Sequence, residues 1–239
     1  MLFSVEGERY ALIDPKKVRE GSYQTSSSDW LVEPVREFLE RSSFSGVLDP
    51  FAGDGMLLDH ISKNWPGVRT RGLDINSLAY ERNDSLVHVP TSANEIIVTN
   101  PPYLAKHSAR RKRVISDVEK YFSETSYSDI YQVALEKCLA SASNVVAIVP
   151  ETFLFSGFHR SRLDRVSILV GSKLFDDTST PVCVACFAGS ATRYTQLYVN
   201  DTRVGTLDEA DSLRSRKSTQ PTVVRFNDCL LYTSDAADD

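Results

Sequence analysis

The feature that most constrains the fold is a short apolar segment that leads into a glycine-rich turn and then into a helix. The apolar pair 47–48 ends at Asp49, and the turn Pro50–Gly55 that follows contains two glycines. Apolar residues then recur at helical spacing over 56–61. Glycine lets the backbone approach a ligand closely, and the N-terminus of the next helix faces the same space. This order of elements predicts a ligand-binding crevice at the carboxyl edge of a parallel sheet.

The rest of the chain alternates between strand and helix patterns. Helical spacing occurs over 31–39, with Ser28 or Asp29 as the expected cap, and again from Ile130 to Cys138, capped by Ser128 or Asp129. Residues 104–127 are polar and basic and indicate a loop with broken helix. Strand patterns occur at 72–75, 96–98, 145–149, 167–170, 182–187 and 197–199. Such alternation predicts an α/β fold with a doubly wound, mostly parallel sheet.

An acidic residue follows the second predicted strand at a position suited to a ribose. Asp74 lies 19 residues beyond Gly55, and a carboxylate there can accept hydrogen bonds from both ribose hydroxyls. The three-glycine pyrophosphate fingerprint is missing from this turn, and so is the Lys-Ser/Thr pair of a phosphate-binding loop. We therefore expect a ligand that has a ribose and no phosphate, rather than NAD or ATP.

The most specific signal is the tetrapeptide Asn100-Pro101-Pro102-Tyr103, which follows the strand 96–98. The two prolines fix the backbone and remove two N–H donors, so their carbonyl groups are left to accept. Asn100 offers a side-chain oxygen as an acceptor, and Tyr103 offers an aromatic face for a flat ring. Together these groups suit an exocyclic amine on a planar heterocycle or an amide.

The turn from Asp49 to Gly55, followed by Asn100–Tyr103, resembles the S-adenosylmethionine-dependent amino-methyltransferases. The resemblance is strongest to the N6-adenine DNA methyltransferases of restriction–modification systems, and it runs from about Gly21 to Phe187. It implies a Rossmann-like class I methyltransferase fold with a seven-stranded-type sheet, and S-adenosyl-L-methionine as cofactor. An upstream motif, Tyr23-Gln24-Thr25, also matches, although Ser26 replaces the proline that usually follows the threonine. The implied cofactor-binding residues are Thr25, Asp49, Pro50, Phe51, Gly53, Gly55, Asp74, Ile75, Asp84 and Asn100.

The resemblance also implies a mechanism. Asn100 and the carbonyl of Pro101 would accept the two amino hydrogens of the target and direct its lone pair at the cofactor methyl group. Tyr103 would stack on a base flipped out of double-stranded DNA, and Phe175 would form the opposite wall, unless Phe175 is an ordinary core aromatic. This chemistry requires neither a metal nor a covalent nucleophile.

Basic residues follow the tetrapeptide directly. We expect them to contact DNA phosphates, although a basic run is often only a solvated face. These residues are Lys106, Arg110, Arg111, Lys112 and Arg113. Cys183 and Cys186 have metal-like spacing, but they lie in an apolar strand pattern without a second pair, so we expect a reduced, buried pair rather than zinc. Glu151 is expected to be a first-turn acid of the next helix.

Alternatives to methylation of adenine N6 in DNA remain open. The same tetrapeptide serves enzymes that methylate protein glutamine amides or N2 of guanine in RNA, although those enzymes carry a dedicated domain before the glycine loop. A non-catalytic DNA-binding or specificity partner is a third hypothesis. The tetrapeptide also does not distinguish adenine N6 from cytosine N4.

Residues 229–239 show no helix or strand pattern and resemble a translated sequencing-library adaptor. We therefore expect a methyltransferase domain over 1–200, the start of a truncated DNA-recognition segment over 201–228, and a non-native tail. Three aspartates lie in that tail, so the net charge of −5 becomes −2 without it. We expect the chain to bind cofactor and to methylate DNA weakly or not at all. No apolar run approaches the roughly 20 residues that span a bilayer, and we expect a cytoplasmic protein that acts on DNA, with a cognate restriction endonuclease as a further partner.

Overall fold

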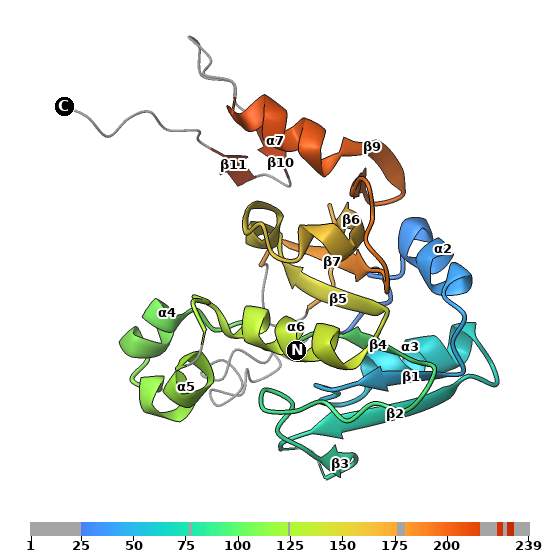
Figure 1. Cartoon of the computed structure of the whole chain (residues 1–239), viewed down its shortest axis with the longest axis vertical. Helices are drawn as coiled ribbons and strands as arrows, with labels where there is room; N and C mark the ends of the chain where they lie inside the picture. Colours follow the sequence, from blue (N-terminus) through green and yellow to red (C-terminus); the bar gives the residue numbers. More distant parts are fainter. Residues whose placement is uncertain are drawn as a thin grey trace, which may run out of the picture.

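The computed structural model of the chain describes residues 25–76, 78–123, 125–175 and 180–215, together with the backbone of 224–226 and 229–231 (Figure 1). Tyr23 and Gln24, from the upstream motif, lie outside the described residues. The nine strands of the main sheet are β1 Gly46–Asp49, β2 Arg69–Asp74, β3 Glu81–Arg82, β4 Glu95–Thr99, β5 Val145–Pro150, β6 Leu163–Ile168, β7 Val182–Phe187, β8 Gln196–Val199 and β9 Thr202–Thr206. The helices are α2 Glu33–Arg41, α3 Met56–Asn64, α4 Lys106–Arg111, α5 Ile115–Phe122, α6 Ile130–Ser141 and α7 Leu207–Ser215, and two 3-10 turns are η1 Glu151–Phe155 and η2 Arg160–Arg162.

The sheet has the strand order β3-β2-β1-β4-β5-β7-β6-β8-β9. Strand β7 is antiparallel to both of its neighbours, β5 and β6, whereas the pairs from β3 through β5 are parallel. The first seven strands thus form the Rossmann-like class I methyltransferase sheet that the resemblance implied, and that fold is confirmed. Strands β8 and β9 extend it beyond the expected seven, with β8 parallel to β6 and β9 antiparallel to β8.

Helices cover both faces of this sheet. Helix α6 lies over β5 on one face (Figure 1), while α2 and α3 lie together on the other. A buried hydrogen bond from Trp30 Nε1 to His60 Nδ1 (3.1 Å) joins the segment before α2 to α3. The central strands β1, β5 and β7 are buried on both faces. Cys183 and Cys186 are free and fully buried in β7, in agreement with the expected reduced pair.

Helix α6 begins at the predicted cap. The Asp129 side chain accepts from the backbone N–H of Tyr131, and Gln132 reaches back to the backbone of Asp129, which completes a capping box. The expected cap of α2 was wrong: the helix begins after Val32, without a side-chain cap. Ser28 instead accepts the Leu31 N–H through its carbonyl oxygen and closes a separate turn.

Strand β6 begins and ends earlier than the predicted 167–170. The start of β6 was not predicted because Asp164 and Arg165 are charged, whereas a strand pattern is recognised by apolar residues at its buried positions. Arg165 is nevertheless only 5% exposed. Its guanidinium bonds Asp164 at 2.8 Å and reaches α2, where it bonds Glu37 Oε2 at 3.1 Å and the Pro34 carbonyl at 2.9 Å.

Residues beyond 200 continue the sheet. Strand β9 pairs with β8, and Leu207 at the start of α7 is buried in the main core. The predicted domain boundary at 200 stays a prediction. Strands β10 Val224–Phe226 and β11 Cys229–Leu231 form an antiparallel pair, so the expectation that the tail lacks a strand was wrong at its apolar first three residues. Within the described ranges, no helix is both long and apolar enough to cross a membrane.

Candidate active site

The glycine-rich turn is held in place by the carboxyl group that ends β1. Asp49 Oδ1 accepts a hydrogen bond from the Phe51 N–H at 3.0 Å and another from the Thr99 hydroxyl at 2.7 Å, at the end of β4. Asp49 is buried, and burial raises the pKa of its carboxyl group to about 7, even though both hydrogen bonds lower it. The nearby carboxylates Asp74 and Asp54 raise the pKa further. The turn therefore brings the carboxyl groups of Asp49, Asp54 and Asp74 close enough at the carboxyl edge of the sheet to affect the ionisation of Asp49.

Asp74, at the end of β2, lies directly against this turn. Its Oδ2 accepts from the Gly53 N–H at 3.0 Å, and its Oδ1 accepts from the Asn76 N–H at 2.7 Å. Gly53 has φ of 55°, and a Cβ placed there would meet no atom within 4 Å. The predicted pairing of the turn with the acid after the second strand is thus present, beside open space that a ligand can enter. Ile75, next in sequence, is 45% exposed.

Tyr80 is part of this region, although none of the sequence motifs includes it. Its ring lies over Gly72 in β2, where a Cβ would come within 2.5 Å of the ring, and its hydroxyl lies against Gly55, where a Cβ would come within 1.8 Å. Both glycines therefore make room for one aromatic side chain. Burial is the main reason that the pKa of Tyr80 is raised, and the carboxylates of Asp59, Asp49 and Asp54 raise it further. The sequence signal that could have identified Tyr80 is an aromatic residue a few positions after the second predicted strand.

The tetrapeptide follows β4 and forms a hydrogen-bonded chain at the same edge. Asn100 Nδ2 donates to Thr25 Oγ1 at 3.2 Å, and the Tyr103 hydroxyl donates to Asn100 Oδ1 at 2.5 Å. The same hydroxyl lies 2.9 Å from the Ile148 carbonyl of β5, and Tyr103 is only 8% exposed. Tyr131 of α6 packs edge-on against the Tyr103 ring, with centroids 6.4 Å apart. The structure therefore brings the predicted residues Thr25, Asn100 and Tyr103 together.

Phe175 reaches this cluster through backbone pairing. Residue 175 forms an isolated antiparallel bridge with Thr25, and the Ser26 N–H donates to the Leu174 carbonyl at 2.8 Å. A proline at position 26 could not make that hydrogen bond, so the departure from the family pattern has a local use. Phe175 is buried, with 8% exposure. Its role as an aromatic wall stays a prediction.

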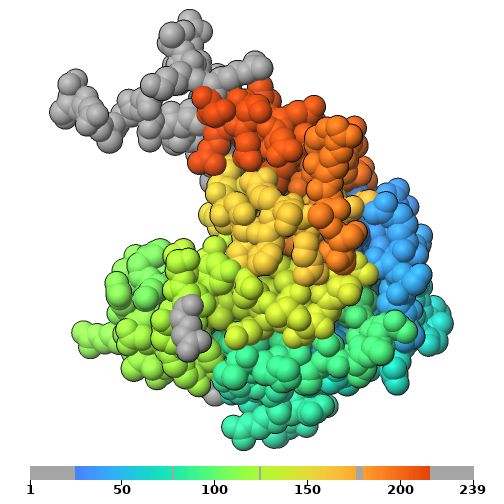
Figure 2. All heavy atoms as spheres, in the orientation of Figure 1, coloured from blue at the N-terminus to red at the C-terminus, as the bar shows by residue number. Residues whose placement is uncertain are grey.

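Asp84 lies against α5, and the basic run lies in and just after α4; the α4–α5 side protrudes as a lobe in Figure 2. Asp84 Oδ2 accepts from the Tyr121 hydroxyl at 2.7 Å and lies 3.6 Å from Lys120 Nζ. Lys106 Nζ lies 5.4 Å from the centroid of the Phe122 ring, so this lysine packs on the lobe. The side chains exposed most fully are those of Arg110, Arg111 and Arg113, while Lys112 is half-buried. The phosphate contacts of these residues remain predictions.

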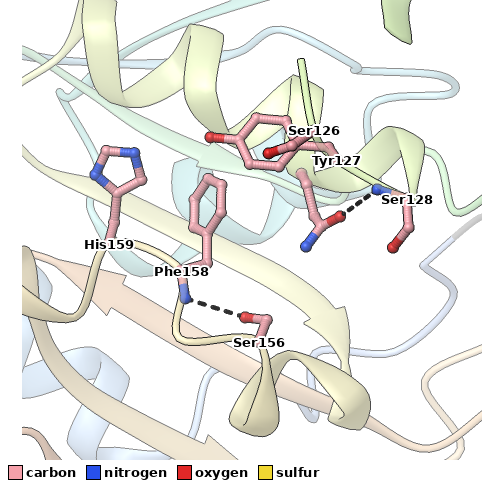
Figure 3. Close-up of a pocket in the computed structure, with 7 residues that line it drawn as sticks. Ser126, Tyr127, Ser128, Ser156, Phe158 and His159 are labelled. Atoms are coloured by element: carbon pink, nitrogen blue, oxygen red, sulfur yellow. Dashed lines mark hydrogen bonds between the residues drawn. The ribbon is translucent and has the colours of Figure 1, made fainter.

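A pocket of about 380 Å³ opens next to the segment that follows Tyr103 (Figure 3). The Lys106 N–H donates to the Ser128 carbonyl at 2.8 Å, and this joins the segment to the pocket rim. Behind the pocket, Glu136 Oε2 lies 2.7 Å from the Tyr127 hydroxyl and 2.8 Å from His159 Nε2. The residues that line the pocket are Ser126, Tyr127, Ser128, Gln132, Ser156, Phe158 and His159. Across the described part of the chain, no group of three or more His, Cys, Asp or Glu side chains could hold a metal ion.

The chain is similar to restriction–modification methyltransferases in sequence and in fold. Residues 57–170 match the family described as Eco57I restriction-modification methylase, a segment that includes Asp74 and the tetrapeptide. This confirms the resemblance to a methyltransferase of that kind. No curated protein matches the chain.

Three solved structures share the fold at 15% sequence identity. The DrdV–DNA complex matches with a TM-score of 0.55 over 86% of this chain and 30% of that one. A modification subunit, described as that of a type I restriction enzyme from Vibrio vulnificus YJ016, matches with a TM-score of 0.50 over 87% of this chain and 56% of that one. The type IIG restriction endonuclease BpuSI matches with a TM-score of 0.50 over 73% and 27%, respectively. This chain therefore spans little more than half the length of the Vibrio vulnificus subunit and less than a third of the length of the other two proteins.

Proposed function

We propose that this chain is the catalytic part of a DNA methyltransferase that transfers a methyl group from S-adenosyl-L-methionine to N6 of adenine. The observation that carries the proposal is the hydrogen-bonded chain Thr25–Asn100–Tyr103, which lies at the same sheet edge as the Asp49 turn and Asp74. Cofactor crevice and amine-binding tetrapeptide are adjacent, as a direct methyl transfer requires. The match to restriction–modification methylases over 57–170 supports the same reaction class.

The residues of the crevice fit a cationic cofactor with a ribose. Asp74 supplies a carboxylate at the end of β2, and Gly53 borders open space. The carboxyl groups of Asp49, Asp54 and Asp74 lie close enough to influence one another, and such a group of acids favours a ligand that carries positive charge. When bound, S-adenosylmethionine supplies an electrophilic methyl group on a sulfonium. Thr25, Pro50, Phe51, Gly55, Ile75 and Asp84 are the further residues proposed to hold it.

The tetrapeptide would make the amine nucleophilic. The lone pair of adenine N6 is delocalised into the ring, so the amine must become pyramidal before it can attack. The Asn100 side-chain oxygen and the Pro101 carbonyl would accept its two hydrogens and so favour that geometry. The Tyr103 hydroxyl donates a hydrogen bond to Asn100 Oδ1. This bond fixes the carboxamide in one orientation before any substrate binds. Pro102 keeps this backbone rigid.

The proposed substrate is double-stranded DNA, with the target base flipped from the helix and enclosed by Tyr103 and Phe175. The exposed arginines 110, 111 and 113 support a phosphate contact beside that entrance. A restriction endonuclease that acts on the same sequence is the proposed partner, as restriction–modification chemistry implies.

Side-by-side transfer of a labelled methyl group to DNA, RNA and protein tests this proposal. The chain is used in excess over mixed-sequence DNA, total RNA or a protein extract, so that even slow transfer is detected. We expect label on DNA only, and none with Asn100→Ala. Label that appears only on protein or only on RNA would overturn the proposed substrate.

A further inference from the structure

Glu151 occupies the position between the two proposed walls of the base site. Along the carboxyl edge the strands follow the order β4, β5, β7, β6. The tetrapeptide follows β4, Glu151 follows β5, and Phe175 lies in the connection between β6 and β7. The backbone N–H of Glu151 donates to the Pro181 carbonyl at 3.0 Å, just before β7 begins. Residue 151 therefore lies at the centre of the edge in the strand order, with the tetrapeptide on one side of it and Phe175 on the other.

One oxygen of this carboxyl group is buried without a hydrogen bond. Among the described residues, Glu151 Oε1 is one of only three buried side-chain polar atoms that lack a partner. The residue as a whole is half-buried, so the rest of the side chain retains access to the edge. A buried, unpartnered oxygen is unfavourable for a carboxylate and much less so for the carbonyl oxygen of a neutral acid.

The surroundings favour the neutral form. Burial raises the pKa of Glu151, and no cation among the described residues offsets that effect. The group that faces it from β7 is the thiol of Cys183, whose pKa Glu151 helps to raise. From η1 itself, the next residue, Thr152, bonds Tyr131 of α6 rather than Glu151. In the neutral form, with Oε1 buried as the carbonyl oxygen, Oε2 would be the atom that carries the proton.

We propose that Glu151 is a specificity-determining residue for the target base, whose carboxyl group donates a hydrogen bond to the ring nitrogen next to the reacting amine. This inference rests on the proposed function, in which Asn100 and Pro101 hold that amine. In adenine the nitrogen is N1, which accepts a hydrogen bond. Guanine presents the donor N1–H on one side of its amino group, where a donating carboxyl group does not pair, and the acceptor N3 on the other side. Glu151 would thus select an amine that has a ring acceptor on the side facing the carboxyl group, as in adenine, and it would disfavour guanine bound with N1–H on that side.

Nucleoside binding tests the inference without requiring catalysis. The full chain is saturated with S-adenosylhomocysteine, and the binding of adenosine, 1-deazaadenosine and guanosine is followed by NMR titration. 1-Deazaadenosine differs from adenosine by a C–H in place of N1. Wild type is compared with Glu151→Ala and Glu151→Gln, and Glu40→Gln, at an exposed position on α2, serves as the matched control.

We expect Glu151→Ala to weaken adenosine binding by about 5- to 10-fold, which is the effect of one lost hydrogen bond. 1-Deazaadenosine should bind wild type weakly and be insensitive to Glu151→Ala. Glu151→Gln, which keeps an N–H donor, should stay within about 2-fold of wild type for adenosine. The infrared difference spectrum between wild type and Glu151→Gln should also contain the band of a protonated carboxylic acid.

Different results would overturn the role of Glu151 and the proposed function. Adenosine binding that is unaffected by Glu151→Ala, or equal losses for adenosine and 1-deazaadenosine, would overturn the role of Glu151 and leave the proposed function standing. A wild-type chain that binds S-adenosylhomocysteine but not adenosine would overturn the proposed adenine target as well.

Discussion

Asn100 donates a hydrogen bond from its side-chain amide to the hydroxyl of Thr25, at 3.2 Å across 75 residues of sequence. This contact joins the segment before α2 to the loop after β4. Thr25 is in turn paired with the backbone of Phe175, so three separate segments converge on one carboxamide. The orientation of Asn100, on which the proposed transfer depends, is therefore set by residues that are distant in sequence.

Removal of the Thr25 hydroxyl should take away the hydrogen bond that orients Asn100, without creating a cavity in the core. Thr25 is 5% exposed, and Thr25→Val preserves its shape. We expect the free energy of unfolding to fall by about 1 kcal/mol, as for a typical buried hydrogen bond. Methyl transfer should fall by about 5- to 50-fold, because the carboxamide is no longer fixed in one orientation. Thr25→Ser should restore both quantities. Transfer at the wild-type rate by Thr25→Val would show that this hydrogen bond does not position Asn100.

The two glycines of the turn should respond differently to alanine. Gly53 has φ of 55° with open space around a Cβ, so Gly53→Ala meets only backbone strain, and we expect a loss of about 1 kcal/mol. Gly55 has φ of 89°, and a Cβ there would come within 1.8 Å of the Tyr80 hydroxyl, so Gly55→Ala should cost about 2 to 4 kcal/mol. Urea denaturation measures both.

The difference should depend on Tyr80. In a double-mutant cycle, Tyr80→Ala should recover about 1 to 2 kcal/mol of the loss caused by Gly55→Ala and none of the loss at Gly53. Equal costs at the two glycines, or a cycle without coupling, would contradict the packing of Tyr80 over the turn.

The buried carboxyl group of Asp49 should make both stability and cofactor binding depend on pH. Its folded pKa of about 7 lies above the ordinary value near 3.8. The unfolded chain therefore loses this proton first as pH rises, and the free energy of unfolding falls between about pH 4 and about pH 7. Asp49→Asn keeps an acceptor for Phe51 and Thr99 and removes that loss. We expect the variant to exceed wild type by about 2 kcal/mol at pH 8, with a smaller difference at pH 5.

Cofactor affinity should move in the opposite direction. Only the ionised Asp49 attracts a cationic ligand, so affinity for S-adenosylmethionine should rise as pH increases from 6 to 8 in wild type and stay flat in Asp49→Asn. Glu40→Gln controls for the loss of an exposed acid. Parallel pH profiles for wild type and Asp49→Asn would show that Asp49 does not titrate in this range.

Local sequence patterns predicted the elements whose residues act on near neighbours. The strand–turn–helix at Asp49–Gly55 and the cap at Asp129 depend on backbone geometry and hydrogen bonds within a few residues, and both are present. The short β3 and the early start of β6 were missed, because neither shows an apolar run. In β6 the buried Arg165 is stabilised by Glu37 on a helix 128 residues earlier, which no local pattern reveals.

The same distinction holds at the site. The motifs identified Asp74 and Asn100, whereas Tyr80 and the unpartnered oxygen of Glu151 became visible only with the tertiary structure. Tyr80 matters because two glycines, 17 positions apart, leave room for it. Glu151 matters because of where β5 ends relative to β4 and β7, and strand order is a property of the whole sheet.

The most direct test of the central claim is a calorimetric titration of S-adenosylmethionine into the folded chain, with Asp74→Ala and Glu40→Gln alongside. We expect saturable binding by wild type and by Glu40→Gln. Binding should be at least about 10-fold weaker for Asp74→Ala, because hydrogen bonds to a charged carboxylate are lost. Absence of binding heat in a folded wild-type sample across several temperatures, or equal affinity in Asp74→Ala, would contradict a cofactor site built on the Asp49 turn and Asp74.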